Sequence, residues 1–291
     1  MRKTILVIRP GALGDTILTL PLLESISTER PDAAITFLGN GSYRDLMPPG
    51  ITLRPMDGPD WLWLFIDPPF RQTGSTPVFD TAYVVLGNSR EVVSNLQQSG
   101  TRSVLWTSSR PTQTRHIVEH VHDGLGLSIP PRKPALLHLS PGVRKDLIWI
   151  HPGSGGPKKC VDLQLIARVA HDLADSTGLN LAVTATEQDA FLWDLPEWKE
   201  IVNHPRTALF ENRPLLEICR ELGAARLFIG NDSGISHLAA GLGIPAAVFF
   251  TATDPVQWMP WVPSENLLVL DLRKEAAPPA WLCARLNRFL A

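Results

Sequence analysis

The 291-residue chain has few cysteines, only two tyrosines and no long apolar run. Its three cysteines, Cys160, Cys219 and Cys283, lie far apart and form no C-x-x-C pair, which argues against a disulfide framework or a zinc ribbon. The apolar stretches fall well short of the ~20 residues of a transmembrane helix, and the first one stops at Arg9, too early for a secretory signal. We therefore expect a cytoplasmic protein. Any contact with a membrane is expected to be peripheral, at the inner face of the inner membrane.

Charge of either sign is also scarce. The chain has 27 Lys and Arg against 29 Asp and Glu, a net charge of −2, and 44% of its residues are hydrophobic. This balance argues against a nucleic-acid partner, since such proteins gain affinity by neutralising many phosphates. Neither a G-x-G-x-x-G fingerprint nor a Walker A loop occurs, which disfavours a dinucleotide oxidoreductase and a P-loop enzyme. The composition is that of a folded globular protein, and the length predicts two domains or one large one.

Short runs rich in Val and Ile alternate with helical segments along the chain. Strands are expected at residues 4–8, 34–38, 51–54, 81–86, 103–106, 147–150, 180–184, 226–229 and 246–250. Helices are expected at residues 115–125, 163–177, 187–193, 214–222 and 235–242, with a further helix starting at Asp15. This alternation predicts an α/β protein with doubly wound parallel sheets. The predicted parts are Rossmann-like domains at 1–130 and 147–278, a proline-rich linker at 131–146, and a helix at 279–291 packing back on the first domain.

The first loop with chemical potential is GALGD, Gly11 to Asp15, directly after the first predicted strand. Ligands of doubly wound sheets bind at the carboxyl ends of the strands, so this position favours a site. One hypothesis makes Asp15 an N-cap that stabilises the following helix. The other makes it a general base, held close to a substrate by a glycine turn.

The second loop is HPGSGGPKK at residues 151–159. Its glycines leave backbone N–H groups unobstructed, and Lys158 and Lys159 supply positive charge, a composition that suits phosphate binding. The alternative is a flexible surface loop. The third segment, NDSG at residues 231–234, would begin a helix whose amides face an anion, and His237 follows one turn later, either as a core histidine or in the site.

Together these motifs resemble glycosyltransferase family 9, which includes the ADP-heptose:lipopolysaccharide heptosyltransferases. The matching segments are GD followed by TLPLL at residues 14–23, HPGSG with the two lysines, NDSGISHLAAGLGIP at residues 231–245, and TDP at residues 253–255 with Trp258 and Pro260. The resemblance implies a GT-B fold, in which two Rossmann-like domains face across a cleft. It also implies that the first domain binds the acceptor and the second binds the nucleotide-sugar.

The resemblance assigns roles residue by residue. Asp15 matches the family's general base, with Gly14 beside it on the acceptor side. Lys158 and Lys159 cover the family lysine at the donor diphosphate, and Lys159 fits its spacing better, although Val161 and Asp162 replace the Trp-Pro that follows in the family. The implied donor-binding residues are Ser154, Gly155, Glu187, Asp232, Ser233, Gly234 and His237. Glu187 would bind the ribose, or is simply a glutamate in the first turn of a helix.

The function that follows from the resemblance is inverting, metal-independent transfer of a heptose or related sugar. The donor would be a nucleoside-diphosphate sugar, ADP-heptose by resemblance, and the acceptor a hydroxyl of a lipopolysaccharide core or another glycan. No cofactor is expected, no D-x-D metal element occurs, and the protein is expected to be a monomer. The alternatives are a GT-B-type transferase or epimerase with another donor, and a non-catalytic relative that binds a sugar nucleotide.

The acceptor is the part of the function on which the sequence says least. The run that contains Trp61 and Trp63 is either core or an apolar surface for a lipid-linked glycan. Five arginines of the first half either meet an anionic acceptor or are simply solvated or paired. They are Arg71, Arg90, Arg102, Arg110 and Arg115.

Overall fold

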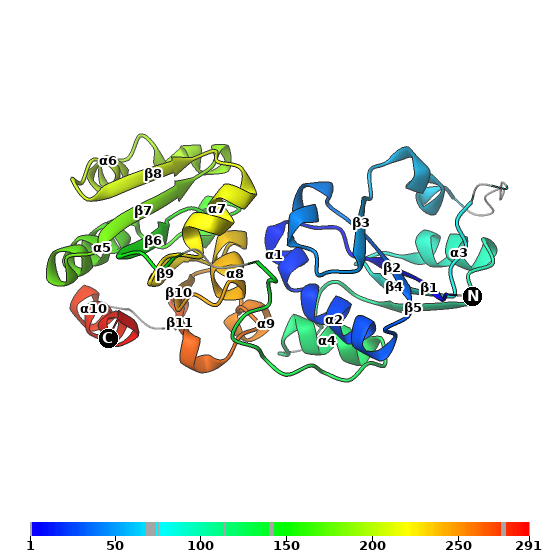
Figure 1. Ribbon diagram of the computed structural model, residues 1–291. Coiled ribbons are helices and arrows are strands. Elements are labelled where there is room, and N and C mark those ends of the chain that lie inside the picture. Colours follow the sequence, from blue (N-terminus) through cyan, green and yellow to red (C-terminus); the bar gives the residue numbers. More distant parts are fainter. Residues whose placement is uncertain are drawn as a thin grey trace. The chain divides into compact units, whose positions relative to one another are not determined.

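The computed structural model describes residues 2–67, 74, 76–112, 114–139, 143–274 and 278–290. The chain forms two compact units, Met1–Pro131 (unit 1) and Arg132–Ala291 (unit 2). Each unit is a parallel sheet with helices on both of its faces (Figure 1), and each is described by itself.

The sheet of unit 1 has five parallel strands in the order β3-β2-β1-β4-β5. They are β1 (Thr4–Ile8), β2 (Ala34–Gly39), β3 (Ile51–Pro55), β4 (Thr81–Val85) and β5 (Ser103–Thr107). The apolar side chains of β1 and β4 are nearly all buried, because helices cover the sheet on both faces. The strand order reverses between β1 and β4, so a ligand is expected at the carboxyl end of β1.

The helices of unit 1 fall into two groups. The α-helices are α1 (Leu13–Ile17), α2 (Leu20–Glu29), α3 (Arg90–Gln98) and α4 (Ile117–Gly124). The 3₁₀ helices are η1 (Gly41–Leu46) and η2 (Pro59–Phe65). Figure 1 shows α2 and α4 together on one face of the sheet, and α3 packs with η2 on the other. Loops and short helices that follow the strands lie at the carboxyl end of this sheet.

Unit 2 contains a six-stranded parallel sheet in the order β11-β10-β9-β6-β7-β8. Its strands are β6 (Leu147–His151), β7 (Asn180–Ala185), β8 (Thr207–Glu211), β9 (Leu227–Asn231), β10 (Ala246–Phe250) and β11 (Leu267–Asp271). Its α-helices are α5 (Leu163–Thr177), α6 (Pro196–Val202), α7 (Leu215–Leu222), α8 (Gly234–Gly241), α9 (Pro255–Trp258) and α10 (Pro279–Leu290). The 3₁₀ helices are η3 (Pro157–Lys159), η4 (Glu187–Leu192) and η5 (Ser264–Asn266). Here the order reverses between β6 and β9, which places their following loops at the expected ligand position.

The structure gives the surroundings of two segments near the expected domain boundaries. The helix at the C-terminus packs against α5 within unit 2. Leu282 and Leu286 are fully buried there, because they lie one turn apart on a single face of α10. The predicted proline-rich linker also belongs mostly to unit 2. The backbone amides of Leu136 and Leu137 both donate to the carbonyl of Gly241 at the end of α8. Residues 140–142 of that stretch lie outside the described residues.

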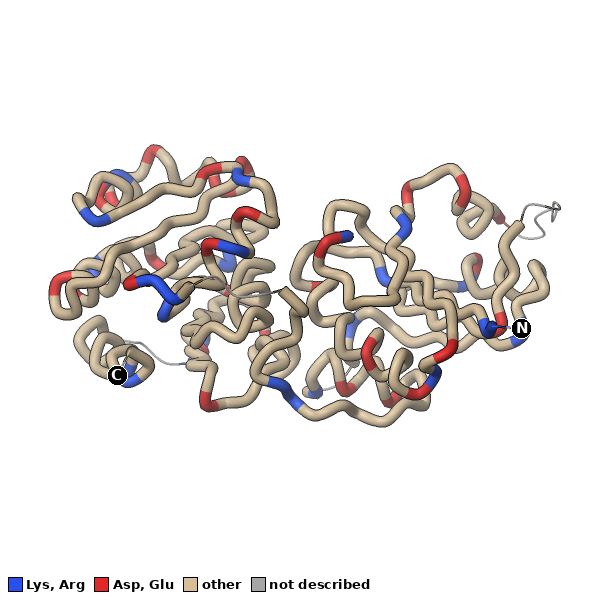
Figure 2. Tube along the Cα trace, viewed as in Figure 1, with Lys and Arg blue, Asp and Glu red and all other residues tan. Residues whose placement is uncertain are grey.

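Charged residues of both signs are scattered along the chain in both units (Figure 2). Every helix in the described ranges is too short or too polar to cross a bilayer.

Candidate functional site

Asp15 lies just beyond the carboxyl end of β1, in the first turn of α1. The helix begins at Leu13 with Ala12 as its N-cap residue, so Asp15 is the third helical residue and not the N-cap that one hypothesis expected. Its Oδ2 accepts a hydrogen bond of 3.1 Å from the backbone N–H of Ala12, which orients the carboxylate. The side chain is still 38% exposed. An oriented and accessible carboxylate can receive a proton from a bound hydroxyl.

Gly11 sets the position of this carboxylate. The residue has φ +157° and lies so close to Asp15 that a Cβ placed on it would be 2.6 Å from both the Cβ and the Oδ2 of Asp15. A real contact of that length does not occur, so only glycine leaves room for the carboxylate where it stands. The glycine turn foreseen in the sequence therefore has a definite steric role.

Arg9 is a buried cation behind Asp15 that the sequence reasoning missed. Its side chain is 1% exposed, and its Nη2 lies 3.6 Å from Oδ1 of Asp15. Its guanidinium nitrogens make no hydrogen bond within the described ranges. Burial lowers the pKa of Arg9, and the charge of Asp15 partly opposes that shift. The signal in the sequence was an arginine that ends an apolar strand at the edge where ligands bind.

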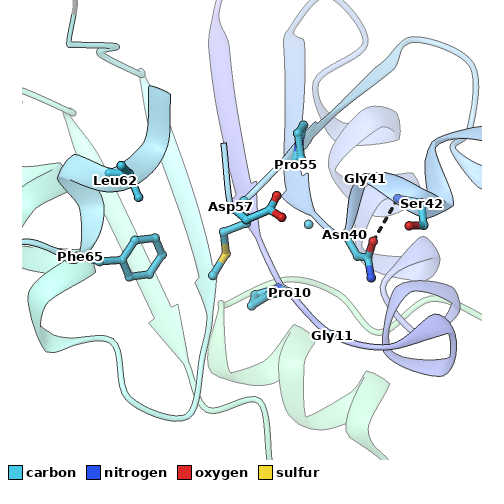
Figure 3. A pocket seen from close by; sticks show the side chains of 11 residues that line it. Pro10, Gly11, Asn40, Gly41, Ser42, Pro55, Asp57, Leu62 and Phe65 are labelled. Atoms are coloured by element: carbon cyan, nitrogen blue, oxygen red, sulfur yellow. Dashed lines mark hydrogen bonds between the residues drawn. The ribbon is translucent and has the colours of Figure 1, made fainter. Parts of the chain in front are cut away.

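A pocket of about 810 Å³ opens beside this loop in unit 1. It is formed where β1, β2 and β3 end and by one side of η2. Its lining residues are Pro10, Gly11, Gly39, Asn40, Gly41, Ser42, Pro55, Met56, Asp57, Leu62 and Phe65. Figure 3 shows Leu62 and Phe65 on one side, Asn40 and Ser42 on the other, and the carboxylate of Asp57 between them. We call this cavity the unit 1 pocket. Gly11 joins it to Asp15, because Gly11 lines the pocket and contacts the carboxylate.

In unit 2, the side chain of Asn231 holds the glycine-rich loop that follows β6. Its Nδ2 donates to the carbonyl of Pro152 at 2.7 Å, and its Oδ1 accepts from the backbone N–H of Val161 at 2.9 Å. Both ends of the loop are thus attached to the end of β9. The side chain of Asp189 packs closely against the same loop. A Cβ placed on Gly153 would lie 1.8 Å from Oδ1 of Asp189. The two ends of the loop and Gly153 are therefore held by contacts within unit 2, while Gly155 and Lys158 between them are exposed.

A polar cluster lies at the carboxyl edge of the unit 2 sheet. Nζ of Lys159 donates to Oδ2 of Asp232 at 2.9 Å, and the hydroxyl of Thr253 donates to the same oxygen at 2.5 Å. Nε2 of His237 lies 4.0 Å from the other carboxylate oxygen. Ser233 is the N-cap of α8, and its Oγ accepts from the backbone N–H of Ser236 at 3.4 Å. The cluster combines a cation, a buried carboxylate and a helix N-terminus, a set that can bind a phosphorylated sugar.

The structure distinguishes the two lysines. Lys159 reaches the cluster, whereas Lys158 is exposed and contributes its backbone carbonyl to a hydrogen bond of 3.0 Å from the Thr251 hydroxyl. Val161 and Asp162, which replace the family's Trp-Pro, have structural tasks of their own. Val161 bonds Asn231, and Asp162 caps α5 by accepting from the backbone N–H of Gln164 at 2.9 Å. The altered register therefore does not remove the lysine from the cluster.

The remaining predicted donor residues are spread over the same edge. Ser154 is buried, and its hydroxyl donates to the carbonyl of Gly156 at 2.7 Å, while Gly155 is exposed. Gly234 is the first residue of α8. Glu187 is exposed at the start of η4, and its backbone N–H donates to Oδ1 of Asn212 at 3.0 Å. The buried carboxylate of that helix is Asp189.

His151, at the end of β6, is a buried histidine. Its Nδ1 lies 3.1 Å from the carbonyl of Thr184. Burial lowers the pKa of His151, while the nearby charge of Asp189 opposes that shift. Packing in this part of unit 2 therefore favours the uncharged form of the imidazole.

The two tryptophans near η2 belong to the interior. Trp61 is buried, stacks on Phe79 with ring centroids 6.3 Å apart, and belongs to the core of unit 1. Trp63 packs against the same core, whereas Leu62 and Phe65 face outward. The run is therefore core on one side and exposed on the other, and an apolar surface for a lipid-linked glycan stays a prediction for the exposed side.

The arginines considered for an anionic acceptor do not gather at the unit 1 pocket. Arg102 pairs with Asp80 at 3.3 Å, and Arg115 pairs with Asp123 at 2.8 Å. Arg90 lines a separate cavity of about 480 Å³ near Trp106, and Arg110 is exposed. Arg71 lies outside the described residues.

No cluster of three or more His, Cys, Asp or Glu side chains suited to a metal ion occurs in the part of the chain that the structure describes. The three cysteines are free thiols.

Two doubly wound parallel units, each with a polar site at the carboxyl edge of its sheet, define the GT-B class of fold. Residues 121–278, more than half of the chain, match Glycosyltransferase family 9 (heptosyltransferase), and the chain belongs to this family. The resemblance and the fold class expected from the sequence are therefore confirmed.

Several proteins named as heptosyltransferases are similar to this chain in sequence or in structure. Lipopolysaccharide heptosyltransferase 3 of Escherichia coli is 31% identical over 132 residues, which cover 44% of this chain and 37% of that protein. The structure of E. coli ADP-heptose lps heptosyltransferase II aligns with a TM-score of 0.74 at 18% identity, covering all of this chain and 98% of the other. E. coli heptosyltransferase WaaC with ADP aligns with a TM-score of 0.70 at 15% identity, covering 99% and 98%. The matched segments span about two fifths of the length of the curated relatives.

Proposed function

We propose that the protein transfers a heptose from ADP-heptose to a hydroxyl of a lipopolysaccharide core or a related glycan, with inversion at the anomeric carbon. The observation that carries the proposal is the pairing of Lys159 with Asp232 at 2.9 Å beside the N-terminus of α8. This arrangement suits a sugar diphosphate. Similar proteins named for ADP-heptose and for bound ADP support the choice of donor.

The chemical step is a single displacement. The acceptor oxygen forms a bond to the anomeric carbon while the bond from that carbon to the diphosphate oxygen breaks. Asp15 takes the proton of the acceptor hydroxyl, and the bonding electrons leave with the diphosphate. Negative charge builds on the diphosphate as it departs. Lys159 and the amides at the start of α8 would stabilise this charge and so lower the barrier of the transfer step. In this scheme Asp232 holds the Lys159 ammonium in place and meets the hydroxyls of the donor sugar.

The first test is Asp15→Asn, assayed for transfer from ADP-heptose. Asn can keep the hydrogen bond from the Ala12 amide but cannot accept a proton as a carboxylate does. We expect kcat to fall by about 10²- to 10⁴-fold, the range for loss of a general base. The circular dichroism spectrum should stay unchanged. Wild-type turnover in a folded variant would remove Asp15 from the reaction.

The donor and the metal requirement need separate measurements. Calorimetry with ADP-, GDP- and UDP-sugars should show the tightest binding for the ADP-sugar, and a preference for another base would favour a different GT-B enzyme. Donor binding without transfer to any acceptor would favour a non-catalytic relative. We propose that no metal or cofactor is required, and activity that disappears in EDTA and returns with a divalent ion would contradict this. The monomeric state and the cytoplasmic location stay predictions, and gel filtration tests the first.

A further inference from the structure

The charge of the unit 1 pocket is negative in its described lining. Among the lining residues that the structure describes, Asp57 carries the single ionisable side chain. Arg44 and Arg54 lie in the same segments, η1 and β3, but neither lines the cavity. No lysine or arginine of the described ranges therefore faces this space, which adjoins the proposed general base through Gly11.

We propose that the unit 1 pocket binds an uncharged saccharide, so that the acceptor sugar of this protein carries no phosphate or carboxylate. The inference rests on the proposed function and narrows its acceptor. A pocket for an anionic sugar needs cations or directed N–H donors, whereas Asp57 would repel an anion placed next to it.

The apolar side of the pocket fits the C–H face of a sugar ring. Leu62 is 57% and Phe65 44% exposed, although both belong to a 3₁₀ helix that buries Trp61 and Leu64 in the core. Trp61 and Leu64 anchor that helix, so Leu62 and Phe65 are held facing outward without a partner of their own in the core. Aromatic rings provide a large, rigid apolar surface at low entropic cost, as a platform for a pyranose requires.

The polar side supplies groups for hydroxyls. Oδ1 of Asn40 accepts a hydrogen bond of 3.0 Å from the backbone N–H of Ser42, which fixes the orientation of the amide. Figure 3 shows the amide nitrogen of Asn40 turned away from that bond. This nitrogen can donate to a sugar oxygen, and the carboxylate of Asp57 can accept from a sugar hydroxyl. One apolar wall and a few oriented polar groups are the usual composition of a site for a neutral ligand.

The test measures acceptor binding without donor, and then transfer. Saturation-transfer NMR is run with a panel of uncharged heptose- and hexose-containing disaccharides and with the monophosphate of each. We expect at least one neutral disaccharide to bind at least tenfold more tightly than its monophosphate, and Phe65→Ala to weaken that binding about tenfold. The matched control is Trp281→Ala on α10, because Trp281 is 45% exposed and lines neither cavity.

Asp57→Lys adds a reversal of charge. It should bring the monophosphate to at least the affinity of the neutral sugar, since the repulsion is replaced by attraction. Absence of binding by every neutral sugar, tighter binding of the monophosphates to the wild type, or equal effects of Phe65→Ala and Trp281→Ala would each overturn the inference.

Calorimetric binding of ADP-heptose distinguishes failure of this inference from failure of the proposed function. If the donor binds and only anionic acceptors are used, the neutral-acceptor inference fails and the proposed function stands. If no nucleotide-sugar binds, the proposed function itself fails.

Discussion

Replacing Gly11 with Ala should displace the Asp15 carboxylate without unfolding the protein. The new Cβ would lie 2.6 Å from both Cβ and Oδ2 and 2.8 Å from Cγ of Asp15. Rotation of the side chain leaves the Cβ of Asp15 in place, so the backbone of the loop must shift and carry the carboxylate with it. This shift breaks the 3.1 Å bond from the Ala12 amide and the 3.6 Å contact with Arg9. We expect kcat at saturating donor and acceptor to fall at least ~100-fold, the lower range for loss of a general base. The backbone cost of Ala at this φ is about 1 kcal/mol.

Gly50→Ala is the matched control for this experiment. Gly50 also lies in unit 1 and has φ +85°, but a Cβ there has no atom within 4 Å. Both variants should therefore lose about 1 kcal/mol of unfolding free energy through backbone strain. Gly11→Ala should lose more than Gly50→Ala because of its contact with Asp15, and only Gly11→Ala should lose turnover. The assay is kcat by ADP release, paired with urea unfolding. If the two variants retain equal kcat, the steric link between Gly11 and a catalytic Asp15 is refuted.

Three further predictions concern charge. Asp15→Ala should lower the free energy of unfolding by about 2 kcal/mol, because Arg9 stays buried without its counter-ion. Adding Arg9→Met should restore the stability measured by urea unfolding but should not restore turnover. Unchanged stability in Asp15→Ala would contradict this. Lys159→Gln should raise the donor KM at least ~10-fold, as for a lost charge-assisted contact, while Lys158→Gln should not, and equal effects in steady-state kinetics would remove the distinction. The unfolded state binds a proton at His151 more readily than the native state does, so stability should fall as the pH drops below about 6.5. His151→Asn should reduce that slope in denaturant titrations between pH 5 and 7.5, and an unchanged slope would show that His151 does not contribute.

The sequence predicted the elements whose local signals agree with their burial. Helix α5 has the predicted bounds, because Asp162 caps its start, apolar residues repeat along one face, and Gly178 ends it with φ +74°. Strand β8 was missed since it is an edge strand with little buried surface, so its residues show no continuous apolar run. Strand β11 was also missed. Its residues are apolar, but they directly follow a stretch dominated by turn signals, which hid the pattern.

The site was predictable in its loops but not in its supporting contacts. Asp15, Lys159 and Asp232 stand in motifs, and the sequence singled them out as candidates. Arg9 was not singled out, because its importance comes from burial beside Asp15. Asn231 was noted only as part of the NDSG segment, because its contacts with the loop after β6 join residues far apart in the chain. In η4, Glu187 alone was named from the sequence, and only the packing against Gly153 shows that Asp189 is the buried carboxylate.

The position of α10 against α5 has a consequence for the modularity of the protein. Because the closing helix stays with unit 2, each unit is one uninterrupted segment of chain, joined to the other at Pro131 and Arg132. The gene can thus be divided at one codon boundary into two reading frames, each encoding a whole sheet with its helices. Recombination at that boundary would exchange the whole of unit 2 between relatives without cutting through its sheet.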